Sequence, residues 1–242
     1  PHAGWTFSGP TAARTLLALG ALEPPETIIL FGAVHRWGVD QPCLYGAGAW
    51  HTPLGDVQID QELATGILAA SSGLALDRPD AHDDEHSIEV QLPFIKHLYP
   101  QTRILPIAMP PVLDAIRMGR TSAIVARQLG RRAVAVGSSD LTHYGPRYGF
   151  APVGVGDRAL AWTHENDARL LDLVENLRAD DVIAEARAHH NACGAGAIAA
   201  AIAFAAELGA KQGLRLHYTT SHEVMPMGRP TDMVGYGAVV FI

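Results

Sequence analysis

Three short apolar segments constrain the fold of this chain more than any other feature. Thr27–Gly32, Arg103–Ala108 and Ala133–Gly137 are rich in strand-forming residues and lack the polar alternation of a half-exposed strand. Such runs are typical of strands that are covered on both faces, as in a parallel sheet. These three segments are therefore expected to form the central strands of the fold.

Helical patterns lie between and after these segments. Asp60 can cap a helix that runs to about residue 71, and Pro93 must kink the expected helix 88–99 or lie in its first turn. The other expected helices cover residues 12–22, 157–176, 180–189 and 194–208, and two late strands are expected at 214–219 and 234–241. Alternating strands and helices predict an α/β fold with three layers, α/β/α, around a mainly parallel central sheet.

Length and composition favour one domain over residues 1–242. The chain has 242 residues, of which 48% are hydrophobic, which suits one sizeable core. The apolar segment 195–206 is shorter than the roughly 20 residues that cross a bilayer, so no membrane partner is expected. Two cysteines indicate a reduced, cytoplasmic setting. Because the chain opens directly in a motif, we expect that an upstream segment has been removed.

The charge of the chain disfavours nucleic acid as a partner. The formal net charge is −7, whereas nucleic-acid phosphates require a basic face, so a small-molecule partner fits better. The arginines of segment 117–132 are interpreted as a solvated helix face, with an anion-binding stripe as the alternative: Arg117, Arg120, Arg127, Arg131 and Arg132.

Polar residues follow the buried strands, where the carboxyl ends of a parallel sheet form a shared crevice. His2, His35 and His143 each lie beside a glycine or a strand end. Cys193 precedes Gly194 at the expected start of a helix, a position that favours the thiolate. Imidazole and thiolate are ligands that borderline metals accept. The residues therefore suggest a metal site, although a buried, inert Cys193 stays open as the alternative.

Several other residues are interpreted as structural. Segment 82–86 carries two histidines and three acids, and we expect a solvated acidic loop there, with His86 and Glu89 as the residues to watch. His189 and His190 suit a helix end, where they cap carbonyl groups. Cys43 is expected in the core.

Five motifs together resemble the Memo family, also called AmmeMemoRadiSam system protein B. They are PHAGWTFSG at residues 1–9, TPLG at 52–55, EHSIEVQLP at 85–93, SSDLTHYG at 138–145 and CG at 193–194. The family is similar in fold to the LigB-like class III extradiol dioxygenases, which hold non-haem iron with two histidines and a glutamate. The resemblance thus implies a LigB-like fold.

The resemblance also implies the roles of individual residues. His2, His35 and Cys193 match the metal position of the family, and Asp140 and His143 match its neighbouring polar pair. In the dioxygenases the comparable histidine serves in acid/base steps, and His143 is expected to do so here. We expect Asp140 to orient His143, as carboxylates commonly do for an imidazole.

Two departures from the family pattern stand out. Family members usually carry a segment before the first motif, including the strand that ends at the motif's histidine. In addition, Arg36 and Trp37 follow His35 where the family commonly shows a small or polar residue. They suggest an altered pocket mouth that suits an anionic or aromatic ligand.

These observations favour a metal-dependent, dioxygenase-like oxidoreductase that acts on a small molecule. One ion per chain is expected, Fe(II) or copper, with zinc also allowed. The alternative is a metal-binding protein without catalysis, or one that binds a protein or peptide partner. Hydrolysis by a zinc-activated water is chemically allowed but less favoured.

Overall fold

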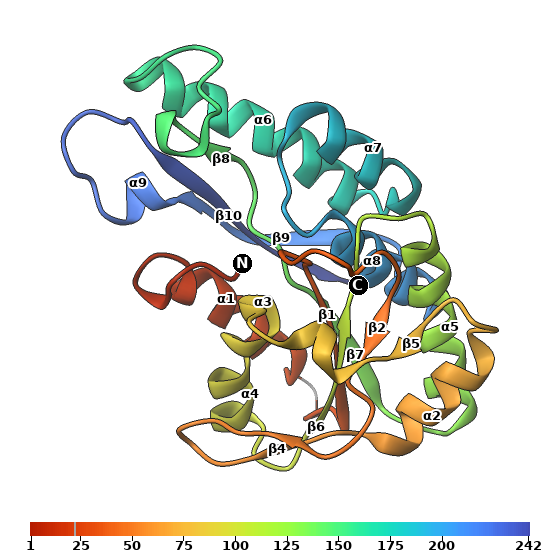
Figure 1. Ribbon diagram of the computed structural model, residues 1–242. Coiled ribbons are helices and arrows are strands. Elements are labelled where there is room, and N and C mark those ends of the chain that lie inside the picture. The colour runs from red at the N-terminus through yellow and green to blue at the C-terminus, as the bar shows by residue number, and fades with distance from the viewer. Residues whose placement is uncertain (22) are drawn as a thin grey trace.

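The computed structural model describes residues 1–21 and 23–242, and its centre is a five-stranded sheet in the order β5-β2-β6-β1-β7 (Figure 1). β1 (Thr27–Gly32) pairs in parallel with β6 (Arg103–Ala108) on one side and β7 (Ala133–Gly137) on the other. Every residue of β1 is buried, as expected for a strand covered on both faces. The three predicted strands are confirmed.

Two short strands complete this sheet. β2 (Cys43–Leu44) runs antiparallel to β6, and β5 (Leu76–Asp77) runs parallel to β2. The sheet is therefore mainly parallel. A separate hairpin pairs β3 (Ala49–Trp50) with β4 (Val57–Gln58).

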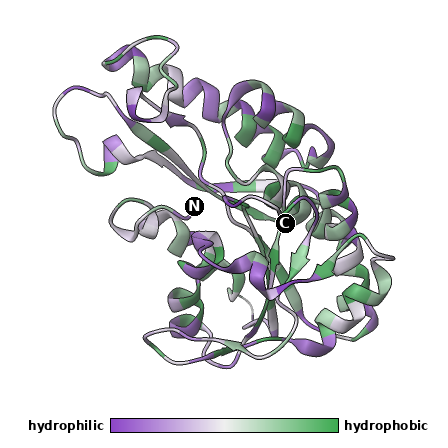
Figure 2. Cartoon of the chain, in the orientation of Figure 1, coloured by the Kyte–Doolittle hydropathy of each residue, from purple (hydrophilic) through white to green (hydrophobic). Residues whose placement is uncertain are grey.

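Helices cover both faces of the sheet, which confirms the expected layers. α2 (Gln61–Ala70), α5 (Asp114–Gln128) and α8 (Ala195–Glu207) pack together on one face, and Asp60 caps α2 as predicted. α1 (Trp5–Leu19), α3 (His86–Glu89) and α4 (Leu92–Leu98) lie on the opposite face (Figure 1). Figure 2 shows hydrophobic residues gathered in the strands between these layers.

Two expected helices have different bounds in the structure. The helix expected over 88–99 is divided into α3 and α4, with Pro93 in the first turn of α4. α1 begins at Trp5, although Pro10 then lies inside the helix. The indole of Trp5 donates to the Val90 carbonyl over 3.0 Å, and this tertiary contact helps to hold the turn before the proline. The end expected at Leu22 lies outside the described residues.

The two late strands are present as expected, and they belong to a second, three-stranded sheet in the order β8-β10-β9. β9 (Gly213–Thr220) and β10 (Met233–Phe241) pair antiparallel, and β10 also pairs with β8 (His143–Tyr144). Only the short α9 (Ser221–Val224) and a loop connect β9 to β10. Such a connection allows antiparallel pairing, whereas parallel neighbours need a long crossover. α6 (Asp157–Glu175) contacts this sheet, and α7 (Ala179–His189) packs between α6 and α8.

Acidic partners hold most of the arginines of segment 117–132. Ion pairs join Arg117 to Asp114, Arg127 to Glu207, Arg131 to Asp60 and Glu62, and Arg132 to Glu23 and Glu26. A solvated, paired surface thus describes this segment better than an anion-binding stripe. No helix in the described part of the chain is long and apolar enough to cross a membrane.

Candidate metal centre

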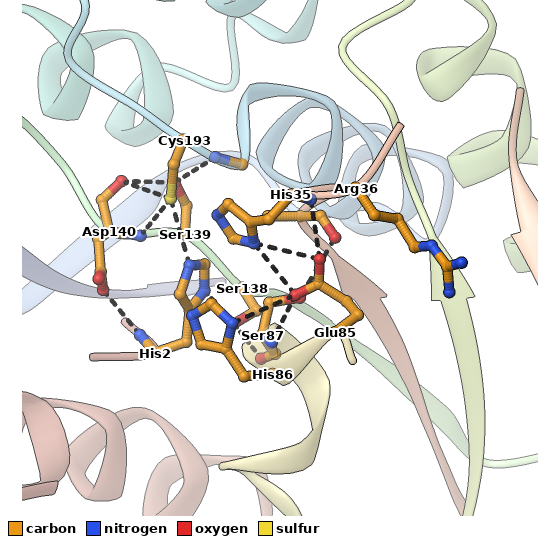
Figure 3. Close-up of polar contacts among 12 residues, drawn as sticks. His2, His35, Arg36, Glu85, His86, Ser87, Ser138, Ser139, Asp140 and Cys193 are labelled. Atoms are coloured by element: carbon orange, nitrogen blue, oxygen red, sulfur yellow. Dashed lines mark hydrogen bonds and ion pairs between the residues drawn. The ribbon is translucent and has the colours of Figure 1, made fainter. Parts of the chain in front are cut away.

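The candidate site lies at the carboxyl edge of the central sheet. His35 follows β1, and the segment 138–140 follows β7, the neighbouring parallel strand. Cys193 stands just before α8, and His2 stands just before α1. Parallel strands bring their carboxyl ends to one edge, so residues distant in the sequence meet there (Figure 3).

His2 is held in one orientation by two contacts. Its backbone N–H donates to Asp140 Oδ1 over 2.7 Å, and its Nδ1 lies 2.9 Å from Ser138 Oγ. The other ring nitrogen, Nε2, lies 3.2 Å from Cys193 Sγ. One nitrogen of this buried imidazole is therefore anchored, and the other faces the thiol.

Glu85 anchors His35 in a similar way. The backbone N–H of His35 donates to Glu85 Oε2 over 2.8 Å, and its Nδ1 lies 3.1 Å from both carboxylate oxygens. Hydrogen bonds to Cys193 and to Glu85 raise the pKa of His35 to about 10. Burial alone would raise the pKa of Glu85, but bonds from His35 and Ser87 lower it to about 2.

His86 is a further candidate ligand that sequence reasoning did not assign to the site. Its ring stacks on His35 at a centroid distance of 4.9 Å and meets His2 edge-on at 5.3 Å. His2, His35 and His86 each offer a nitrogen within 4.8 Å of the others, a group that could hold a metal ion. Figure 3 shows the three imidazoles facing one another.

The expected solvated loop at residues 82–86 is therefore only partly correct. Asp83 and Asp84 are exposed, but His82 and Glu85 are buried. The buried carboxylate of Glu85 is satisfied by the backbone N–H groups of His35 and Ser87. A run of charges looks the same in sequence whether its side chains face water or turn inward.

Cys193 lies in a polar environment and is not an isolated core thiol. Its Sγ accepts a hydrogen bond from the Asp140 backbone N–H at 3.3 Å and lies beside His2. Burial would raise its pKa, but hydrogen bonds with His2 and His35 lower it to about 6. Gly194 permits this approach, because a Cβ there would come within 2.4 Å of the Ser138 carbonyl oxygen.

In the structure, Asp140 and His143 do not form the pair that was expected. Asp140 Oδ1 accepts from His2, whereas His143 Nδ1 lies 3.1 Å from the Leu141 carbonyl oxygen. Among the described residues, no hydrogen bond joins Asp140 to His143, so Asp140 supports His2 and does not orient His143. The His143 ring meets the Tyr148 ring edge-on at 5.1 Å.

Arg36 and Trp37 do not shape the site as expected. Arg36 turns away from the histidines (Figure 3), and its guanidinium donates to the Asp80 and Asp83 carbonyls. Trp37 is 99% exposed. Because the Arg36 guanidinium donates to these carbonyl groups and faces away from the histidines, Arg36 is not placed to bind an anion at the site.

The residues interpreted as structural stay outside the histidine group. Cys43 is fully buried in the core, as expected. His189 contacts Arg169 and Glu185 on the surface, and His190 ends α7 in the left-handed conformation. Glu89 is exposed on α3.

Comparison with known proteins agrees with the motifs. The family model of the Memo-like proteins matches residues 1–240. A MEMO1 family protein of Thermococcus onnurineus is 38% identical over 251 residues, covering 100% of this chain and 84% of the relative. MEMO1 family proteins of Pyrococcus abyssi and Methanopyrus kandleri are 39% and 36% identical, with 84% and 81% of each relative covered. The chain therefore belongs to the Memo family.

Proposed function

We propose that this chain binds one metal ion through His2, His35 and Cys193, with His86 beside them as a further donor. The carrying observation is that His2 and His35 are each oriented through one ring nitrogen, which leaves the other nitrogen for the ion. His2 is anchored to Ser138 and His35 to Glu85, both through Nδ1. Metal-binding histidines commonly use one nitrogen for such a partner and the other for the ion.

The donor set limits which ions fit. Imidazole and thiolate suit iron, copper and zinc, and a soft thiolate favours Cu(I) in particular. The likeness to LigB-like dioxygenases supports Fe(II), although those enzymes use a carboxylate where this chain has Cys193. A bound iron or copper ion would supply redox chemistry with oxygen.

On this basis we propose a metal-linked oxidoreductase that acts on a small molecule. His143 is the proposed acid/base group, because it lies three residues beyond Asp140 in the sequence and its ring is held in place by the Leu141 carbonyl and Tyr148. Asp140 is proposed to hold His2 in place, because its carboxylate accepts a hydrogen bond from the His2 backbone N–H. A thiolate is easily oxidised, so we expect little ring cleavage of simple catechols and metal-linked redox behaviour instead.

Elemental analysis of purified variants tests the metal proposal. Wild type is expected to hold about one ion per chain, and His35→Ala and Cys193→Ala to lose most of it, because each removes a ligand. His51→Ala is the matched control, since His51 is exposed and, within the described part of the chain, its side chain pairs only with Asp56. Unchanged occupancy in both ligand variants would refute the assignment.

Oxygen uptake by the Fe(II)-loaded protein with a catechol separates catalysis from binding alone. Uptake that requires His143 supports an oxidoreductase. If the protein is fully occupied by metal and takes up no oxygen with any redox-active ion, the result supports a protein that binds metal without turnover.

A further inference from the structure

His86 differs from the other two histidines of the candidate centre in how its ring is held. His2 Nδ1 lies 2.9 Å from Ser138 Oγ, and His35 Nδ1 lies 3.1 Å from both carboxylate oxygens of Glu85. In contrast, His86 Nδ1 lies 3.8 Å from Glu85 Oε1, which is beyond hydrogen-bond reach. Among the described residues, no hydrogen bond joins the His86 ring to the protein. Two imidazoles are therefore anchored, and the third can turn.

Glu85 is committed to His35 and does not fix His86. Its carboxylate accepts from the backbone N–H groups of His35 and Ser87, over 2.8 Å in each case. The side chain of Glu85 is 2% exposed, whereas that of His86 is 50% exposed. His86 is the first residue of α3, and rotation about its side-chain bonds moves the ring without moving the sheet.

His86 is nevertheless placed to reach the same ion as His2 and His35. One nitrogen of each ring lies within 4.8 Å of the other two. Two nitrogens bound to one tetrahedral ion lie about 3.4 Å apart, since each bond is about 2.0–2.1 Å long, so small movements of the rings bring them onto one ion. A fourth donor, Cys193 Sγ, lies 3.2 Å from His2 Nε2. Four donors thus gather at one place.

The number of protein ligands decides whether a bound ion can accept anything else. Tetrahedral sites with four protein ligands are closed, whereas sites with three keep one position for water or substrate. His2, His35 and Cys193 together leave one position of a tetrahedral ion open. A nitrogen of His86 is placed to fill that position.

We propose that His86 is a displaceable fourth ligand, which closes the coordination of the resting ion and leaves when a small molecule binds to the ion. This inference rests on the metal binding proposed above. The anchored rings of His2 and His35 keep the ion in place during the exchange. The cost of releasing His86 is reduced, because the half-exposed ring regains water and side-chain freedom. The closed state keeps other molecules off the ion until one binds more strongly than this imidazole.

Azide binding to the Co(II)-loaded protein tests the proposal. Co(II) takes the place of iron or zinc, and its visible absorption depends on the ligands around it. Azide must displace His86 in wild type, whereas the position is open in His86→Ala, so the variant is expected to bind azide about tenfold or more tightly. His51→Ala is the matched control and is expected to bind azide as wild type does, because His51 is an exposed histidine that pairs with Asp56.

Two further measurements separate a ligand from a structural residue. Imidazole added to Co(II)-loaded His86→Ala is expected to restore the absorption of wild type, because it replaces the missing ring as a ligand. Proton NMR of wild type does not depend on folding of the variant. The ring protons of His86 are expected to be shifted by the paramagnetic ion and to lose this shift when azide is in excess.

Equal azide affinity of His86→Ala and wild type overturns the proposal. It is also overturned if imidazole leaves the spectrum of the variant unchanged, or if excess azide leaves the His86 proton signals of wild type unchanged. Loss of Co(II) from a His86→Ala variant whose circular dichroism matches wild type would make His86 an obligatory ligand, which again contradicts the proposal. In each of these cases, one Co(II) ion per wild-type chain leaves the metal proposal standing, whereas wild type that binds no Co(II) refutes both.

Discussion

His143 contributes no nitrogen to the group formed by His2, His35 and His86. Its Nδ1 is engaged by the Leu141 carbonyl, and its ring packs against Tyr148. We therefore predict that His143→Ala keeps most of the metal that wild type holds, while His35→Ala loses it. Elemental analysis of the two variants at equal protein concentration measures the metal that each one retains. Loss from His143→Ala as complete as from His35→Ala would make His143 a ligand.

At the residue scale, the structure brings His2, His35 and Cys193 together at one edge of the sheet, and their positions beside strand ends and a helix start can be recognised locally in the sequence. Glu85 and His86 could not be assigned in this way. Their roles depend on α3 packing against β1, which turns the Glu85 carboxylate onto the His35 backbone. A local charge pattern contains no information about such a long-range contact.

Gly119 sets how closely two helices of one layer approach. It lies on α5, and a Cβ at this position would come within 2.2 Å of the Ala200 carbonyl oxygen on α8. Backbone cannot move aside as a side chain can. We predict that Gly119→Ala lowers the free energy of unfolding by roughly 1–3 kcal/mol, the usual cost of overpacking.

Urea unfolding checks this prediction, with Arg120→Ala as the control. Arg120 is the next residue of α5 and is exposed, so its substitution is expected to change the free energy of unfolding by less than about 0.5 kcal/mol. If Gly119→Ala and wild type have the same free energy of unfolding, α5 and α8 can move apart without a loss of stability.

At the element scale, the sequence predicts best where one local rule decides. β1, β6 and β7 have the expected bounds because burial on both faces removes polar residues from the whole strand. The partner of β10 is decided by the connection through α9, which the apolar pattern of β10 does not reveal. The late strands were therefore recognised as strands, whereas their antiparallel pairing in a second sheet was not predicted.

At the scale of the whole molecule, Asp167 connects three parts of the fold. This buried residue of α6 accepts from the Thr142 backbone N–H over 2.9 Å and from the Tyr218 hydroxyl over 2.8 Å. Gly235 of β10 leaves room for it, since a Cβ there would come within 1.9 Å of Asp167 Oδ2. One carboxyl group thus joins α6, the segment that carries His143, and the antiparallel sheet.

Asp167 makes the stability of the protein depend on pH in a predictable direction. Burial raises its pKa from 3.8 to about 6, although its hydrogen bonds act in the opposite direction. Between these two values the folded chain keeps a proton that the unfolded chain has lost, so this group lowers the free energy of unfolding as pH rises. From pH 4.5 to 7 the decrease amounts to about 2 kcal/mol, at 1.36 kcal/mol per pKa unit.

We predict that Asp167→Asn abolishes this contribution. The variant loses at least one hydrogen bond and is less stable, but its deficit relative to wild type should narrow by about 2 kcal/mol between pH 4.5 and 7. Urea unfolding at both pH values, with a chelator to keep the metal site empty, measures the difference. Glu165→Gln on the exposed face of α6 is the control and should show no such change. A deficit that stays constant or widens with pH would show that Asp167 remains ionised in the folded chain, so that its hydrogen bonds outweigh its burial.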